Sequence, residues 1–171
     1  MVSSAIDGFL SKEVEVIQSG GVAGGLVGFV LGKLKHLHLL DLSKQAIAHV
    51  HYEGGYALDA EENFSLQQVN AKLAQFGAEF SEDIGRVYYA NFCDFENVRS
   101  LHMVVEGENG KVSVFIVPHD ATYLAEGSSQ DRRYNSQAVD LKRASIVVVQ
   151  EAGTNNNKMM EQLKRKIQFS A

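Results

Sequence analysis

The sequence predicts an α+β domain, in which an antiparallel sheet of four to five strands carries helices packed on one face and is preceded by a glycine-rich N-terminal helix. Three observations predict this class: a capped helix after Ser65, a hairpin signal at Asn109-Gly110, and a continuous apolar run of strand length near the C-terminus. We divide the 171 residues into a helical leader, 1–52, and an α+β globular domain, 53–171.

The composition is that of an ordinary globular chain. With 45% hydrophobic and 22% charged residues, it is large enough to bury a core without disulfide or metal cross-links. The formal net charge is -5, so the chain lacks the basic surplus that binds phosphates, and nucleic acid is not expected as a partner. The single cysteine cannot form an internal disulfide and is compatible with a reducing or an oxidising compartment.

The leader contains an uncharged run, residues 20–32, in which every fourth residue is a glycine. On a helix these glycines share one face, which a second helix can approach closely: Gly20, Gly24, Gly28 and Gly32. Thirteen residues cover roughly 20 Å as a helix, whereas a bilayer core is about 30 Å thick. Three interpretations stay open: a helix packed on its own protein or on a second copy, a membrane-associated anchor, or a flexible leader. Lys33 and Lys35 favour a cytoplasmic C-terminal side.

Two helices are expected before the strands. From Leu34 to Tyr52 the apolar residues recur at steps of three and four, and Gly54-Gly55 ends this amphipathic helix. Its histidines form two i,i+2 pairs whose side chains diverge on a helix, so they are interpreted as solvated or interfacial: His36, His38, His49 and His51. The second helix begins with a capping box formed by Ser65 and Gln68 and stops before Gly77.

Strands are expected from about residue 86. Asn109-Gly110 in a hairpin turn would place Glu108 opposite Lys111, His102 opposite Val117 and Ser100 opposite His119. One face of this hairpin is uniformly apolar and is predicted to face the core: Leu101, Met103, Val105, Val112, Val114 and Ile116. The other face is mixed, and we expect another element to cover half of it.

The predicted register suggests one candidate site. His102 and His119 would be diagonal neighbours, and Cys93 could join them from the preceding strand. Such a set could bind a soft metal, or an imidazole could lower the pKa of the thiol. The alternative is structural, because a lone cysteine between phenylalanines is usually a small buried hydrophobe. Motifs for a nucleophile with its base, or for a bound nucleotide or zinc, are not found, so neither an enzyme nor a cofactor is expected.

The C-terminal third is interpreted as a polar loop, a strand and a helix. Residues 125–137, "AEGSSQDRRYNSQ", are typical of a turn-rich connection. Residues 143–153, "RASIVVVQEAG", predict a central strand, and residues 155–169 predict a closing helix with lysines in its last turns.

Three stretches between residues 49 and 151 form a pattern of helix, hairpin and strand: "SLQQVNAKLAQFGAEF", "GRVYYANFCDFENVRSLHMVVEGENGKVSVFIVP" and "IVVVQE". Through them, roughly residues 49–150 resemble the extracytoplasmic domain of an uncharacterised proteobacterial family of inner-membrane proteins. More distantly, the order of helix, strand and hairpin is similar to the outer domains of membrane-anchored anti-sigma factors. In the uncharacterised inner-membrane family, a cytoplasmic anti-sigma-like segment and one membrane helix precede the domain.

The resemblance implies a non-catalytic sensing or interaction domain, anchored at the inner membrane with its globular part in the periplasm. It implies a protein partner or self-association, and it leaves the small-molecule ligand unknown. Sigma-factor binding is not carried over, because the cytoplasmic segment of the family has no counterpart here. The apolar run is also shorter and richer in glycine than an anchor should be, and Lys33 and Lys35 lie on the wrong side for an outward-facing C-terminus. The alternative from the residues alone is a thiol or metal protein that uses Cys93, His102 and His119.

Overall fold

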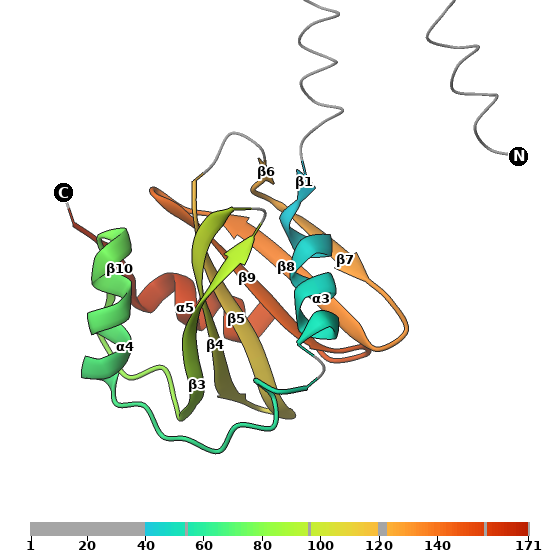
Figure 1. Cartoon of the computed structure of the whole chain (residues 1–171), viewed down its shortest axis with the longest axis horizontal. Helices are drawn as coiled ribbons and strands as arrows, with labels where there is room; N and C mark the ends of the chain where they lie inside the picture. The colour runs from blue at the N-terminus through green and yellow to red at the C-terminus, as the bar shows by residue number, and fades with distance from the viewer. Residues whose placement is uncertain (1–39, 54, 96, 120–122, 156, 171) are drawn as a thin grey trace, which may run out of the picture. The chain divides into compact units, whose positions relative to one another are not determined.

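The computed structural model describes residues 40–170 apart from 54, 96, 120–122 and 156. The expected glycine face at residues 20–32 lies outside these residues. In the described part the chain is an α+β domain with three α-helices and a six-stranded antiparallel sheet (Figure 1). The helices are α3 (Leu42–Tyr52), α4 (Leu66–Leu73, followed by the 3-10 turn Ala74–Phe76) and α5 (Asn157–Lys166).

The large sheet has the strand order β3-β4-β5-β9-β8-β7. Its strands are β3 (Val87–Phe95), β4 (Val98–Gly107), β5 (Gly110–Pro118), β7 (Gly127–Gln130), β8 (Tyr134–Asp140) and β9 (Ala144–Glu151). Two small pairs accompany it: β1 (Leu40–Asp41) with β6 (Tyr123–Leu124), and β2 (Ala78–Phe80) with β10 (Ile167–Phe169). The apolar run at residues 143–153 forms β9, an internal strand, as predicted.

The strand count is higher than predicted because residues 125–137 are not a loop. They form most of the β7–β8 hairpin, in which Ser128 pairs with Gln137 and Gln130 with Asn135. Serine, glycine and glutamine have little intrinsic preference for strands, so this hairpin is held by its neighbour β9 rather than by its own composition.

Helices cover both faces of the sheet, not one. On one face α4 and α5 pack on the apolar side of the β4–β5 hairpin, through Val69, Leu73, Met160 and Leu163. On the other face α3 packs on β7, β8 and β9 and contributes to a second core cluster, with Leu42, Ala46, Ile47 and Val50 next to Phe115 and Val147 (Figure 1). The mixed face of the hairpin is thus covered by another element, as expected. The middle strands are buried on both sides, which favours residues such as valine and isoleucine throughout.

Helix α3 belongs to the same compact unit as the sheet. The helix, which falls within the predicted leader 1–52, supplies part of the core of this unit. The helix begins at Leu42, where the Asp41 side chain accepts hydrogen bonds from the backbone N–H groups of Ser43 (2.9 Å) and Lys44 (3.4 Å). Leu40 and Asp41, which we expected within the helix, form the short strand β1 instead.

The capping box that predicts α4 is confirmed. The Ser65 hydroxyl accepts from the Gln68 N–H at 3.2 Å, and the Gln68 side chain accepts from the Ser65 N–H at 2.8 Å. Gly77 ends the segment with φ 64°, in the left-handed region that favours glycine. The closing helix is shorter than predicted, because Ile167 leaves it to pair with Phe80.

The β4–β5 hairpin has the predicted faces but not the predicted register. Its turn residues are Glu108 and Asn109, so Glu106 pairs with Lys111 and His102 pairs with Phe115. Every pair is displaced by two residues from the prediction. Because side chains alternate with a period of two, this displacement keeps each side chain on its face and changes only its neighbours.

None of the helices in the described residues is long and apolar enough to cross a membrane.

Candidate functional site

Three polar side chains meet between α3 and the sheet. Nε2 of His49 lies 3.1 Å from Oε1 of Glu53, and Nδ1 of His102 lies 3.0 Å from Oε2 of the same carboxylate. His49 is on α3, Glu53 is its C-terminal cap residue and His102 is in β4. We call these three residues the His–Glu cluster. The cluster joins the end of a helix to the middle of a strand on one face of the sheet.

Local helix geometry places two members of the cluster. His49 and Glu53 are four residues apart, so their side chains lie on the same face one turn from each other. The backbone N–H of Glu53 donates to the His49 carbonyl at 3.0 Å, which fixes the last turn of α3. Val50, next to His49, is buried in the core cluster below α3. Packing of α3 on the sheet therefore aims the carboxylate at β4.

The sheet places the third member. His102 pairs with Asn91 of β3 and with Phe115 of β5, and its ring stacks on Phe115 with a centroid distance of 4.1 Å. Its Nε2 lies 3.1 Å from the Ser113 hydroxyl. The side chain is only 1% exposed, so both ring nitrogens are used inside the protein. A hydroxyl can donate or accept, and Ser113 therefore satisfies either tautomer of the ring.

Aromatic rings surround the cluster. His49 stacks on Phe95 at 5.1 Å between centroids, and its ring edge approaches Phe115 at 5.5 Å. Tyr89 lies 5.4 Å from His102 in an edge contact. These apolar walls exclude water from one side of the cluster and strengthen its electrostatic interactions.

The charge state of the cluster follows from burial and hydrogen bonding. Burial raises the pKa of the Glu53 carboxyl, but hydrogen bonds from His102 and His49 outweigh it and lower this pKa to about 2. Burial lowers the pKa of His102, and the bond and charge of Glu53 oppose this only in part. At neutral pH the cluster therefore contains an ionised carboxylate beside a neutral His102 imidazole that donates through Nδ1.

Of the residues predicted from the sequence, Cys93 lies near the cluster but has the properties of a structural residue. Cys93 pairs with Ser100, which is two residues before His102 in β4, so Cys93 and His102 are on the same face of the sheet. Cys93 also packs against the core cluster below α3. Burial, and then the Glu53 and Asp94 carboxylates, raise the pKa of the thiol to about 12. The thiol is therefore protonated at physiological pH and is a poor nucleophile.

His119 does not join Cys93 and His102. It follows the end of β5, four residues beyond the partner of His102, which corresponds to roughly 13 Å along a strand. Its Nε2 lies 2.7 Å from Oδ1 of Asp140, at the surface. His119 was predicted to lie near His102 because the predicted register of the hairpin differs from the observed one by two residues. His51 is also at the surface, 2.6 Å from Asp131, in agreement with its interpretation as a solvated histidine.

The sequence analysis missed Glu53 and the part that His49 plays with it. One signal was available, because "HVHYE" contains a histidine and a glutamate at i,i+4 on a helix. Their meeting with His102 had no signal in the sequence, since it depends on how α3 packs across the sheet.

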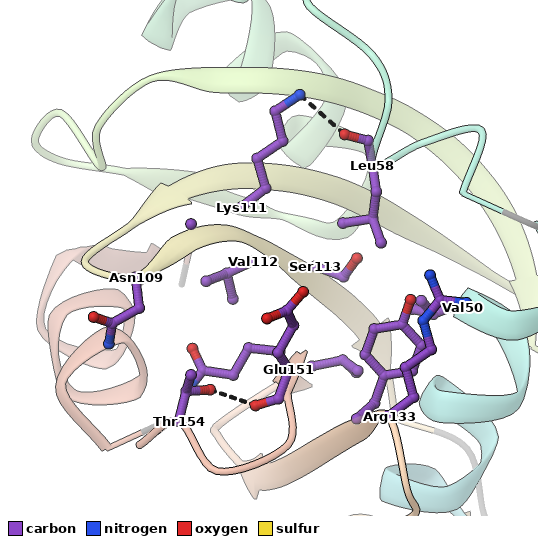
Figure 2. A pocket seen from close by; sticks show the side chains of 13 residues that line it. Val50, Leu58, Asn109, Lys111, Val112, Ser113, Arg133, Glu151 and Thr154 are labelled. Atoms are coloured by element: carbon purple, nitrogen blue, oxygen red, sulfur yellow. Dashed lines mark hydrogen bonds between the residues drawn. The ribbon is translucent and has the colours of Figure 1, made fainter.

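A pocket of about 310 Å³, shown in Figure 2, is lined in part by Ser113, whose hydroxyl lies 3.1 Å from Nε2 of His102 in the cluster. It lies between the end of α3, the β4–β5 turn and the turn after β9, and Val50, Leu58, Arg133 and Glu151 are among its lining residues. Figure 2 shows Lys111 extended away from the pocket centre toward the carbonyl of Leu58, to which it donates at 2.9 Å. The Ser113 hydroxyl is thus the group shared by the pocket wall and the His–Glu cluster.

Comparison with known proteins gives a family for the chain. The family model described as "Protein of unknown function (DUF3379)" matches residues 21–167. No curated protein and no solved structure matches the chain. The matched range includes nearly all of the glycine-rich run together with the sheet and the His–Glu cluster. Because it spans most of the sequence, the chain belongs to this family, the proteins of unknown function DUF3379.

Proposed function

We propose that the chain is a non-catalytic sensing and interaction domain, tethered near its N-terminus at the inner membrane, that controls a regulatory protein partner from the periplasmic side. The proposal follows the resemblance of parts of the sequence to the extracytoplasmic domain of an uncharacterised family of inner-membrane proteins and, more distantly, to the outer domains of membrane-anchored anti-sigma factors. The family match supports treating the glycine-rich run and the globular domain as parts of one protein, because it spans both.

The observation that carries the proposal is the bond between Glu53 and His102. Helix α3 is the first described helix after the N-terminal residues, and its C-terminal cap residue, Glu53, is held 3.0 Å from the buried side chain of His102 in the sheet. A change of charge or ligand at this point alters how firmly the end of α3 is held. In the proposed function, α3 passes that change toward the N-terminal tether and the partner.

The arrangement around Ser113 does not favour catalysis, although it contains a serine, a histidine and a carboxylate in hydrogen-bonded order. The Ser113 side chain is buried, with 1% of the residue exposed. Its strand lies between β4 and β9, so the backbone N–H groups around Ser113 bond within the sheet and cannot stabilise an oxyanion. We expect no labelling of Ser113 by a fluorophosphonate probe, and rapid, stoichiometric labelling would contradict the non-catalytic role.

The location can be tested in cells of the native host. A chain tagged at its C-terminus should fractionate with the inner membrane, and its tag should be digested by protease in spheroplasts but not in intact cells. A cytoplasmic protein of known location, measured in the same samples, controls for lysis. The proposed function would be contradicted if the tagged chain were recovered in the cytosol and its tag resisted protease in spheroplasts.

The partner can be sought by site-specific photocrosslinking from the exposed side chains at the end of α3, such as Tyr52, which is 91% exposed. The proposal predicts a crosslink to a partner protein, and the yield of this crosslink should change in the Glu53→Gln variant. A matched crosslinker at Lys142, an exposed residue before β9, serves as the control position. Identical crosslinks in the presence and absence of the Glu53 carboxylate would contradict transmission through α3.

A further inference from the structure

The His–Glu cluster has the donor set and the spacing of a metal site. Its three potential ligand atoms, one from each of His49, Glu53 and His102, lie within 4.8 Å of one another. Ligands of a tetrahedral zinc ion, at about 2.0–2.2 Å from the metal, lie roughly 3.4 Å apart. The carboxylate is already 3.0–3.1 Å from each imidazole nitrogen, so shifts of side chains alone could admit an ion.

The partner of His102 suits a metal ligand. A histidine that binds a metal through one nitrogen usually donates a hydrogen bond through the other, which fixes the tautomer and the ring plane. Nε2 of His102 lies 3.1 Å from the Ser113 hydroxyl, and stacking on Phe115 holds the ring. When an ion takes the place of the bond to Glu53, the proton of His102 lies on Nε2 and is donated to Ser113, and the lone pair of Nδ1 then faces the ion beside the Glu53 carboxylate.

The ligand types of the cluster and its exposure to solvent both suit a bound metal ion. Two imidazoles and one carboxylate are borderline ligands that suit zinc, nickel, cobalt or iron as divalent ions. The side chains of His49 and Glu53 are 17% and 18% exposed, whereas that of His102 is 1% exposed. An ion can therefore reach the cluster from the side of α3 and keep solvent in its remaining coordination position.

We propose that His49, Glu53 and His102 bind a divalent first-row transition metal ion, through Nε2, the carboxylate and Nδ1 respectively. The proposal deepens the sensing function and rests on it for its biological meaning, because it names the ligand that the domain detects. Binding replaces the two hydrogen bonds between imidazole and carboxylate by three bonds to one ion, and thereby holds the end of α3 more tightly to β4.

Zinc and cobalt binding to the purified full chain test the site. All proteins carry His36→Gln and His38→Gln, so that the leader histidines do not contribute. Zinc affinity is measured by competition with a chromophoric chelator, and cobalt coordination is followed by its visible absorption. We expect about one equivalent of zinc, and His49→Gln and Glu53→Gln should each weaken binding by at least about tenfold. His102→Gln should weaken zinc binding to the same extent if the variant folds. If it does not fold, the test rests on His49→Gln, because His49 is partly exposed and its replacement leaves the core intact.

Matched controls come from histidines and a cysteine outside the cluster. His51→Gln, on the same helix, and His119→Gln, each paired with an aspartate at the surface, should leave zinc affinity within about twofold of the parent. Cys93→Ser should also leave the zinc affinity unchanged.

Ser113→Ala should weaken zinc binding by about tenfold, because the Nε2–H of His102 then lacks its acceptor. Absence of binding at micromolar zinc, or binding that persists in His49→Gln and Glu53→Gln, would overturn the proposal.

The outcomes separate this inference from the proposed function. A chain that binds zinc at the cluster but fractionates with the cytosol keeps the metal site and loses the periplasmic sensing role. A chain exposed to protease in spheroplasts that binds no zinc keeps the location and loses the metal. Loss of binding in Cys93→Ser and His119→Gln, with His49→Gln unaffected, would assign the metal to the set first predicted from the sequence.

Discussion

Nδ1 of His102 lies 3.0 Å from the Glu53 carboxylate, and this bond connects the middle of β4 to the end of α3. Both groups lie in a protein region walled by aromatic rings, where an unpaired charge or donor is costly. The bond therefore stabilises the packing of α3, and it is also the point at which a change of charge reaches the helix.

Replacing the Glu53 carboxylate should destabilise the protein. Glu53→Gln keeps the size of the side chain but removes the charge that the two imidazoles approach, so we expect the free energy of unfolding to fall by about 1–3 kcal/mol. Urea denaturation measures the loss. Glu62→Gln, at an exposed position in the following loop, should change the free energy by less than about 0.5 kcal/mol. Equal effects of the two variants would contradict the buried bond.

The metal-free protein should lose stability on acidification. The pKa of His102 is lowered from 6.5, so its contribution is complete above about pH 6.5 and is lost as the pH falls below that value. The pKa of Glu53 is lowered from 4.5 to about 2, so its contribution is complete above pH 4.5 and is lost between pH 4.5 and 2. Urea denaturation with a chelator present, at several pH values, measures both steps. Glu53→Gln should flatten the step below pH 4.5, and an unchanged step would assign acid sensitivity to other groups.

The thiol of Cys93 should be unreactive in the folded protein. Because its pKa is raised from 9.0 to about 12, the thiolate fraction at pH 8 is about a thousandfold lower than for an unperturbed thiol. An aromatic disulfide reagent should label Cys93 slowly in buffer and rapidly in urea. The same reagent with a small-molecule thiol controls for its intrinsic rate. Equal rates for the folded and unfolded chains would show a reactive thiol and favour the alternative function.

Gly107 tests the register of the β4–β5 hairpin. It pairs with Gly110, and a Cβ at this position would lie 2.5 Å from a Val112 methyl group and 2.8 Å from the Gly110 carbonyl oxygen. We therefore expect Gly107→Ala to reduce the free energy of unfolding by about 1–3 kcal/mol. Glu108→Ala, one residue on at an exposed turn position, should cost less than about 0.5 kcal/mol. A neutral Gly107→Ala would contradict the observed turn.

Local signals in the sequence predicted the elements that depend on local chemistry. The capping box at Ser65 and Gln68 locates the start of α4, because both hydrogen bonds form within four residues. Alternation along "SLHMVVEGENGKVSVFIVP" assigns the core face of β4 and β5, because a displacement of two residues does not change which side a residue faces.

The remaining features depend on contacts between distant segments. The β7–β8 hairpin is polar in composition and takes its strand conformation from β9, so propensity does not indicate it. The hairpin turn lies one residue earlier than Asn109-Gly110, and that change moves His119 away from His102. Glu53 and His102 are 49 residues apart, and only the packing of α3 on the sheet brings them together.

A double-mutant cycle between Glu53 and His102 measures the interaction most directly. The free energies of unfolding of the wild type, Glu53→Gln, His102→Gln and the double variant are obtained by urea denaturation at pH 7. If the two side chains hold α3 on the sheet, the double variant should lose at least about 1 kcal/mol less than the sum of the single losses. Losses that add within about 0.3–0.5 kcal/mol would show that the two residues act independently and would contradict the account.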